Sequence, residues 1–265
     1  MRVVIRGGGD IATGIALRLI RSGMEVVICE QARPTAIRRT VSFSECMRTG
    51  ETTVEGITAR RAHLGQVESL LARDVVPVLE DPSAGSLPGL RADAVVDAIL
   101  AKVNLGTTLH MAPVVVGVGP GFTAGTDCHA VVETMRGHTL GRVYYAGSAL
   151  PNTAVPGLIG GFTGERVLRA PADGVFRQIL EIGAQVKAGD IAATVEGEPI
   201  VCQISGILRG ILPDGTPVHK GMKAGDVDPR CEVSHCYTVS DKALAVGGGV
   251  LEAILHLSGA LAKGR

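Results

Sequence analysis

The sequence lacks tryptophan and has only three tyrosines and four phenylalanines in 265 residues, so its core must be built from aliphatic side chains. It also lacks net charge, because Lys+Arg and Asp+Glu are 26 each. Without a basic field, we expect neither nucleic acid nor an anionic membrane surface as a partner. The six cysteines are too scattered for a disulfide framework, and from the strand-like start Met-Arg-Val-Val-Ile we expect no signal peptide. These features predict a cytoplasmic protein.

Long apolar runs are interrupted, which argues against a membrane span. Residues 143–164 contain two prolines and five glycines, and residues 243–261 contain Glu252, His256 and the run Gly247–Gly249. We expect the second segment to form a buried helix over 242–257, starting at a Ser240-Asp241 cap. Three glycines would cost such a helix roughly 3 kcal/mol relative to alanine. Because this cost must be offset, we expect the helix to pack closely against the first domain. A third phosphate-facing glycine loop is the alternative.

Glycine is abundant, with 36 residues, and the first cluster follows a strand-like run over 2–6. A helix-spaced segment over 11–20 and a second strand over 26–29 come next. Gly7, Gly9 and Ala12 then match the dinucleotide fingerprint in its G-x-G-x-x-A form, in which the first glycine makes a tight turn and the second lets a diphosphate approach. Glu30 follows 21 residues after Gly9, where a carboxylate could accept ribose hydroxyls. The predicted cofactor-binding residues here are Gly7, Gly8, Gly9, Asp10, Ala12, Thr13 and Glu30. A glycine turn without a ligand is the alternative, because Asp10 would repel a diphosphate unless it caps the helix.

A second glycine-rich loop follows the strand over 114–118 and adds Gly119 and Gly121 to the predicted binding residues. Ligands bind at the carboxyl ends of parallel strands, so two such loops predict a crevice. Cys128 and His129 come next and are the weak catalytic candidates. A positive neighbour could make Cys128 a reactive thiolate, and the alternative is an inert buried thiol. Adjacent residues on a strand point to opposite faces, which argues against a shared metal.

Residues 172–195 and 204–227 repeat each other, with seven identities in sixteen positions between 174–189 and 206–221. The two arms resemble the barrel-sandwich hybrid of biotinyl and lipoyl domains. Carrier domains of that family present a modified lysine on the turn between the halves, but the turn over 195–200 has no lysine. We therefore expect a rigid docking or lid element without lipoate or biotin. Cys231, His235 and Cys236 offer only part of a zinc ligand set, so no metal is predicted.

Long strings along nearly the whole chain resemble the YqeB family, accessory proteins of selenium-dependent molybdenum hydroxylase systems. They include RGGGDIATG at 6–14, GPGFTAGTD at 119–127, HAVVET at 129–134, GDVDPR at 225–230 and GGGVLEA at 247–253. The resemblance implies a role in maturing a molybdenum hydroxylase, inserting or handling its cofactor or selenium. It implies the hydroxylase or its maturation factors as partners, but no assigned catalytic residues.

Together these observations predict an α/β Rossmann-like domain over 1–165 with hairpin embellishments. An all-β barrel-sandwich-hybrid module over 166–230 and a helical tail over 231–265 that returns to the first domain would follow. The leading functional hypothesis is an accessory protein that binds a small nucleotide-bearing ligand, either NAD(P) or a molybdopterin dinucleotide. An NAD(P)-dependent oxidoreductase and a non-catalytic scaffold are the alternatives.

Overall fold

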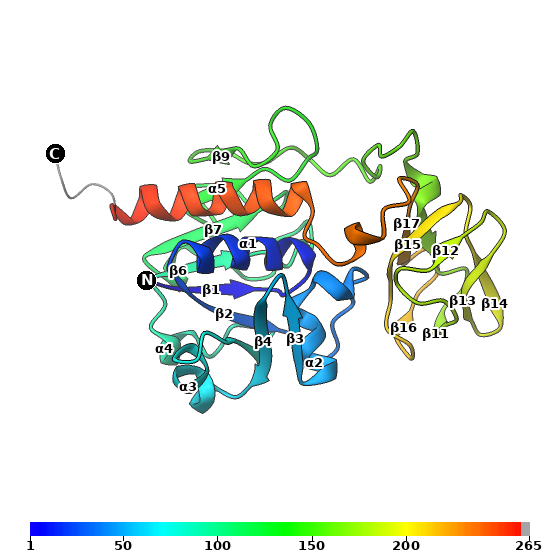
Figure 1. Ribbon diagram of the computed structural model, residues 1–265. Coiled ribbons are helices and arrows are strands. Elements are labelled where there is room, and N and C mark those ends of the chain that lie inside the picture. The colour runs from blue at the N-terminus through cyan, green and yellow to red at the C-terminus, as the bar shows by residue number, and fades with distance from the viewer. Residues whose placement is uncertain (261–265) are drawn as a thin grey trace. The chain divides into compact units, whose positions relative to one another are not determined.

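A computed structural model describes residues 1–260, and the chain divides into two compact units (Figure 1). Unit 1 comprises Met1–Pro34, Ser42–Asn152 and the segment from Val239 on. Unit 2 comprises Thr35–Val41 and Thr153–Thr238. Within residues 1–260, no helix has both the length and the apolar character needed to cross a membrane.

Unit 1 is built on a nine-stranded sheet in the order β3-β4-β5-β2-β1-β6-β7-β8-β9. The strands from β4 to β8 pair in parallel, and β3 and β9 are antiparallel edge strands. The bounds are β1 Arg2–Arg6, β2 Glu25–Glu30, β3 Glu51–Val54, β4 Ile57–Ala62, β5 Val76–Glu80, β6 Ala94–Asp97, β7 Val114–Val118, β8 Ala130–Val132 and β9 Val143–Tyr144. The central strands are continuous apolar runs, such as Val3-Val4-Ile5, because both faces of this sheet are covered.

Two long helices, α1 (Asp10–Arg21) and α5 (Asp241–Ser258), lie side by side against the sheet (Figure 1). Side chains on β1, β2 and β5 to β7 form a second apolar layer with α3 (Val67–Leu71) and α4 (Leu87–Leu90). The remaining helices of the described chain are short: α2 Cys46–Thr49, η1 Arg39–Val41, η2 Phe43–Glu45, η3 Leu64–Gln66, η4 Leu109–Met111, η5 Gly164–Arg166 and η6 Val233–Cys236.

Glycines allow α5 to approach its neighbours closely. A Cβ added at Gly14 would lie 2.5 Å from the Ala243 Cβ, and one at Gly247 would lie 2.9 Å from the Gly14 carbonyl oxygen. A Cβ at Gly249 would lie 2.2 Å from the carbonyl oxygen of Gly141. The glycine run is therefore helical and serves packing, with α1 on one side and the turn before β9 on the other.

Unit 2 consists of two four-stranded antiparallel sheets, ordered β10-β17-β15-β12 and β14-β13-β11-β16. The bounds are β10 Val167–Arg169, β11 Gly174–Gln178, β12 Gln185–Val186, β13 Ile191–Val195, β14 Glu198–Val201, β15 Gly206–Ile211, β16 Pro217–Val218 and β17 Lys223–Asp228. The sequence repeats exchange strands: β12 of the first repeat pairs with β15 of the second, and β16 of the second pairs with β11 of the first. The core holds the side chains of Phe176, Leu208 and Ile211.

The predicted fold class, a Rossmann-like domain plus a barrel-sandwich-hybrid module, is wrong. Unit 1 has a nine-stranded mixed sheet, in which the chain after β2 forms short helices and then the β3–β4 hairpin. Unit 2 has two separate antiparallel sheets. The glycine turn and the helical spacing after it specify only the local β1-α1-β2 segment. Sheet width and strand order depend on pairings between residues far apart in the sequence, and no short motif reports them.

Candidate functional site

The strand order of unit 1 reverses at β1, and the chain leaves β1 and β6 at the same carboxyl edge of the sheet. From β1 the chain passes through α1 to β2 on one side, and it later returns to place β6 on the other side. Arg6 and Asp97 are paired residues at the ends of β1 and β6. In open α/β sheets, ligands bind outside the carboxyl ends of the strands at such a reversal. The candidate site therefore lies where β1 and β6 end.

Gly7 and Gly9 have different roles in the turn between β1 and α1. Gly7 has a φ of +90°, and an added Cβ would lie 3.0 Å from the Ala98 carbonyl oxygen, so the fold itself requires glycine there. Gly9 is the N-cap of α1 with a φ of −67°, and an added Cβ would have no atom within 4 Å. Only Gly9 thus presents backbone to open space, beside the first turn of a twelve-residue helix.

Glu30 lies beside the same turn, but its carboxylate is bound to the protein itself. The Gly8 N–H donates to Glu30 Oε2 at 2.8 Å, and the Gln31 N–H donates to Oε1 at 2.7 Å. Burial raises the pKa of Glu30, while the hydrogen bonds from the Gln31 and Gly8 backbones act to lower it. Glu30 therefore ties the glycine turn to the end of β2, a role that differs from the predicted binding of ribose hydroxyls.

The other predicted residues of the turn mainly hold it in place. An added Cβ at Gly8 would lie 3.0 Å from the Ser44 nitrogen, whose N–H donates to the Gly8 carbonyl oxygen at 2.8 Å. Thr13 Oγ1 donates to the Gly8 carbonyl oxygen at 3.3 Å and accepts from the Phe43 N–H at 2.8 Å. Ala12 is fully buried in α1, and Asp10 is the first residue of that helix, after the N-cap.

The second glycine loop is held by close contacts of its own. Gly119 has a φ of +81°, and an added Cβ would lie 2.8 Å from Thr134 Oγ1. Gly121 has a φ of +108°, and an added Cβ would lie 2.8 Å from the Lys102 carbonyl carbon and from Val103. Gly121 thus packs against the loop that leaves β6, which brings the second glycine loop to the candidate site.

Arg6 forms a buried polar network beneath the site that the sequence patterns do not reveal. Arg6 and Asp97 are 2% and 1% exposed, and Arg6 Nη1 lies 3.0 Å from Asp97 Oδ2. Thr107 Oγ1 donates to the same carboxylate oxygen at 2.6 Å and accepts from Arg6 Nη1. Arg6 Nη2 donates to the Leu105 carbonyl oxygen at 3.1 Å. A charged residue at the end of two otherwise apolar strands is the signal that could have pointed to this pair.

Cys128 and His129 lie near the start of β8 and do not form a reactive pair. Cys128 is fully buried in the apolar layer with Val95, Val115 and Phe122, and burial raises the pKa of its thiol to about 11. The Val115 N–H donates to His129 Nδ1 at 2.9 Å, so that nitrogen carries no proton. This geometry gives no support to a thiolate at neutral pH.

Unit 2 brings the tail residues near a charged cluster. Cys231 is exposed and Cys236 is buried, while His235 Nδ1 lies 3.7 Å from Asp228 Oδ2. Over residues 1–260, no three His, Cys, Asp or Glu side chains are placed to hold a metal ion. Asp228 accepts instead from Arg209 and Arg230, at 3.2 and 2.6 Å.

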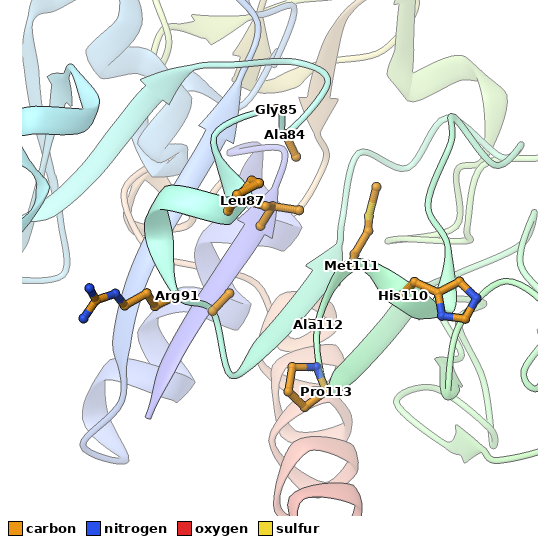
Figure 2. A pocket seen from close by; sticks show the side chains of 10 residues that line it. Ala84, Gly85, Leu87, Arg91, His110, Met111, Ala112 and Pro113 are labelled. Atoms are coloured by element: carbon orange, nitrogen blue, oxygen red, sulfur yellow. The ribbon is translucent and has the colours of Figure 1, made fainter.

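A shallow pocket of about 670 Å³ lies elsewhere in unit 1, and no predicted site residue lines it. Figure 2 shows His110 and Met111 on one side and Leu87 and Ala84 on the other. The lining residues are Ala84, Gly85, Leu87, Pro88, Arg91, Ala92, His110, Met111, Ala112 and Pro113. Its polar side chains, Arg91 and His110, do not converge on a common point, so the pocket carries no evident chemistry.

The fold defines a two-unit α/β protein with a candidate ligand site at the β1/β6 reversal. The chain belongs to the YqeB family: it is 52% identical over 256 residues to the uncharacterised protein YqeB of Escherichia coli K12. The match covers 96% of this chain and 47% of that relative, so the chain spans about half the relative's length. No family model matches the sequence.

Similarity to solved structures is low. A succinylglutamate desuccinylase/aspartoacylase of Rhodobacter sphaeroides is 15% identical with a TM-score of 0.27, over 85% of this chain and 84% of that one. An aspartoacylase family protein of Mesorhizobium loti is 12% identical with a TM-score of 0.24, over 79% and 58%. The ectoine utilization protein EutE (DoeB) of Ruegeria pomeroyi is 13% identical with a TM-score of 0.22, over 54% and 62%. TM-scores this low establish no common fold.

Proposed function

We propose that this protein binds a small nucleotide-bearing ligand at the carboxyl ends of β1 and β6, as an accessory protein in the maturation of a molybdenum hydroxylase. The observation that carries the binding proposal is the open approach to Gly9 at the N-terminus of α1, beside the reversal of strand order. The maturation role is what the sequence resemblance implies, and the matched relative is itself uncharacterised. The proposed ligands are a molybdopterin dinucleotide or NAD(P), and the proposed compartment is the cytoplasm.

The N-terminal end of α1 favours an anionic group, against the negative charge of Asp10 in its first turn. The first N–H groups of a helix have no partners inside the helix, and the helix dipole adds a partial positive charge at that end. The N-cap Gly9 supplies no side chain to satisfy these groups. A phosphate is the ligand group that such a helix end binds best. Because the strand order reverses at β1, the loop after β6 lies beside the glycine turn. A diphosphate bound at Gly9 would therefore have the end of α1 on one side and this loop on the other.

An NAD(P)-dependent oxidoreductase is less well supported. The acidic residue that would bind the ribose of a dinucleotide is Glu30, and both of its oxygens accept backbone N–H groups. Binding a ribose there would require these bonds to break. Neither Cys128 nor His129 is placed at the carboxyl ends of β1 and β6 to supply a proton.

The binding proposal is tested by isothermal titration of NAD⁺, NADP⁺, CDP and pyrophosphate into the wild type and Gly9→Ala. The added methyl group meets no protein atom, so the variant should fold as the wild type does. It would occupy the space that the phosphate needs, and we expect binding to weaken at least tenfold, which is about 1.4 kcal/mol. Gly65→Ala is the matched control, because an added Cβ there also has no atom within 4 Å.

Two results would contradict the binding proposal: no binding of any of these ligands by the wild type, or equal binding by Gly9→Ala and the wild type. The maturation role is tested separately by native mass spectrometry of protein purified from its own host. A co-purifying molybdenum hydroxylase, or a bound pterin nucleotide, is the expected result.

A further inference from the structure

We infer that residues 98–108, which we name the recognition loop, bind the heterocyclic ring of the ligand through the exposed side chains of Val103 and Leu105. This inference rests on the proposed function and deepens it, because it assigns the ring-bearing part of the ligand to a particular segment. The recognition loop follows β6 directly and therefore leaves the carboxyl edge beside the first glycine turn.

The recognition loop is fixed to both glycine loops. The start of the recognition loop packs against the first glycine loop: a Cβ added at Gly7 would lie 3.0 Å from the Ala98 carbonyl oxygen and from Ile99. Its middle packs against Gly121 of the second glycine loop. From below, the buried Arg6 donates to the Leu105 carbonyl oxygen at 3.1 Å. The loop therefore connects the two glycine loops in one defined position.

Side-chain hydrogen bonds hold the end of the recognition loop in the same way. Asn104 Nδ2 donates to the Thr107 carbonyl oxygen at 2.9 Å, and Asn104 Oδ1 accepts from the Thr107 N–H at 2.7 Å. The same Asn104 amide nitrogen donates to Asp127 Oδ1 at 3.2 Å. Asp127 in turn accepts from the Thr123 N–H, so the loop is connected to the segment after Gly121.

This position is held at a cost in backbone energy. Leu100 and Lys102 have φ values of +61° and +66°, a region that residues with a Cβ rarely adopt. Conformations of this kind persist where the surrounding structure imposes them, and they cluster at ligand sites. The close packing of residues 102 and 103 on Gly121 and the Arg6 contact impose them here.

The constrained recognition loop presents apolar side chains to solvent. Val103 and Leu105 are 59% and 53% exposed, although they flank a residue with three side-chain hydrogen bonds. A nucleobase or pterin ring has apolar faces and is commonly covered by apolar side chains in its binding site. The aromatic residue of the second glycine loop, Phe122, is 4% exposed and cannot provide a stacking surface. Aliphatic side chains are the apolar surface that this edge of the sheet offers to a ring.

The test compares ligands with and without a ring. Pyrophosphate, CDP, GDP and NAD⁺ are titrated calorimetrically into the wild type, the double variant Val103→Ser/Leu105→Ser, and the control Val233→Ser, which changes a valine of unit 2 that is 47% exposed. We expect the double variant to bind the ring-bearing ligands at least fivefold more weakly and to bind pyrophosphate within twofold of the wild type. The control should match the wild type for every ligand.

The outcomes separate this inference from the proposed function. If the wild type binds CDP, GDP or NAD⁺ and the double variant binds them equally well, the recognition loop does not bind the ring and the inference fails alone. Equal weakening for pyrophosphate and the ring-bearing ligands would also overturn it, because the change would then act on the phosphate site. If the wild type binds none of the four ligands, the proposed function fails first.

Discussion

The glycine run of α5 offers a stringent test of the packing described above, because three adjacent positions have different surroundings. Gly248 is exposed, and an added Cβ would meet no atom within 4 Å. At Gly247 the nearest atoms would be Arg18 Cγ and the Gly14 carbonyl oxygen, both at 2.9 Å. At Gly249 the Gly141 carbonyl oxygen would lie at 2.2 Å, well inside contact distance.

These distances give the sign of each substitution to alanine. In a helix interior, glycine is about 0.8–1.0 kcal/mol less favourable than alanine, so Gly248→Ala should stabilise by roughly that amount. Overpacking costs about 1–3 kcal/mol, so Gly249→Ala should lose up to about 2 kcal/mol after the helix gain is subtracted. Gly247→Ala should fall between them, because the Arg18 side chain can move and the Gly14 backbone cannot.

The measurement is thermal unfolding followed by far-ultraviolet circular dichroism. For a domain of 150–250 residues, 1 kcal/mol corresponds to roughly 2–4 °C in Tm. We expect Gly248→Ala to melt above the wild type, Gly247→Ala slightly below it and Gly249→Ala lowest. A Gly249→Ala protein that melts with Gly248→Ala, or above the wild type, would refute the close approach of α5 to the turn before β9.

Three further predictions follow from burial and charge. Under limiting iodoacetamide at pH 7.5, the exposed Cys231 should be alkylated well before Cys128, because burial raises the pKa of the Cys128 thiol to about 11. Equal alkylation rates in peptide mass spectrometry would contradict the burial of Cys128. Burial alone would raise the pKa of Asp228, but hydrogen bonds from Arg230 hold this pKa well below its usual range. The charged Asp228 therefore contributes fully to stability above the unfolded-state pKa of about 3.9, and this contribution is lost as the pH falls below that pKa. Asp228→Asn should therefore lower the urea midpoint at pH 7 and reduce its decline below pH 4, and an unchanged decline would count against the charged pair. Glu133 is fully buried, and its carboxylate accepts hydrogen bonds from three backbone N–H groups at 2.7–2.9 Å. Glu133→Gln turns an amide N–H₂ toward one of these donors, so it should lower the free energy of unfolding in urea by about 1–3 kcal/mol. An unchanged free energy of unfolding would exclude these three hydrogen bonds.

Several features of the candidate site could not be predicted from the sequence, because they join residues that no local pattern connects. Arg6 and Asp97 are separated by 91 residues and meet only because β1 and β6 become neighbours. Glu30 has the spacing of a ribose-binding acid, yet the fold turns both of its oxygens to backbone N–H groups. A spacing rule gives the distance along the chain, but it does not show which donor a side chain will meet.

The sequence by itself determined the elements that arise from short-range chemistry. A strand, a glycine turn and a helix with 3.6-residue spacing require only neighbouring residues, and β1, the turn at Gly7 and α1 formed where these patterns lie. The YqeB family membership was also readable from the sequence, because long identical strings do not depend on knowing the fold. The internal repeat was visible as well, since it is a property of the chain.

The tertiary structure alone decided the order of the nine strands, the exchange of β12 and β16 between the repeats, and the burial of Cys128. Each depends on hydrogen bonds or contacts between distant residues, and the free energy of such pairing is shared over the whole sheet. The glycines of α5 illustrate both contributions. The sequence shows that the helix-destabilising effect of three glycines must be offset, and the structure shows that these glycines approach the backbones of Gly14 and Gly141.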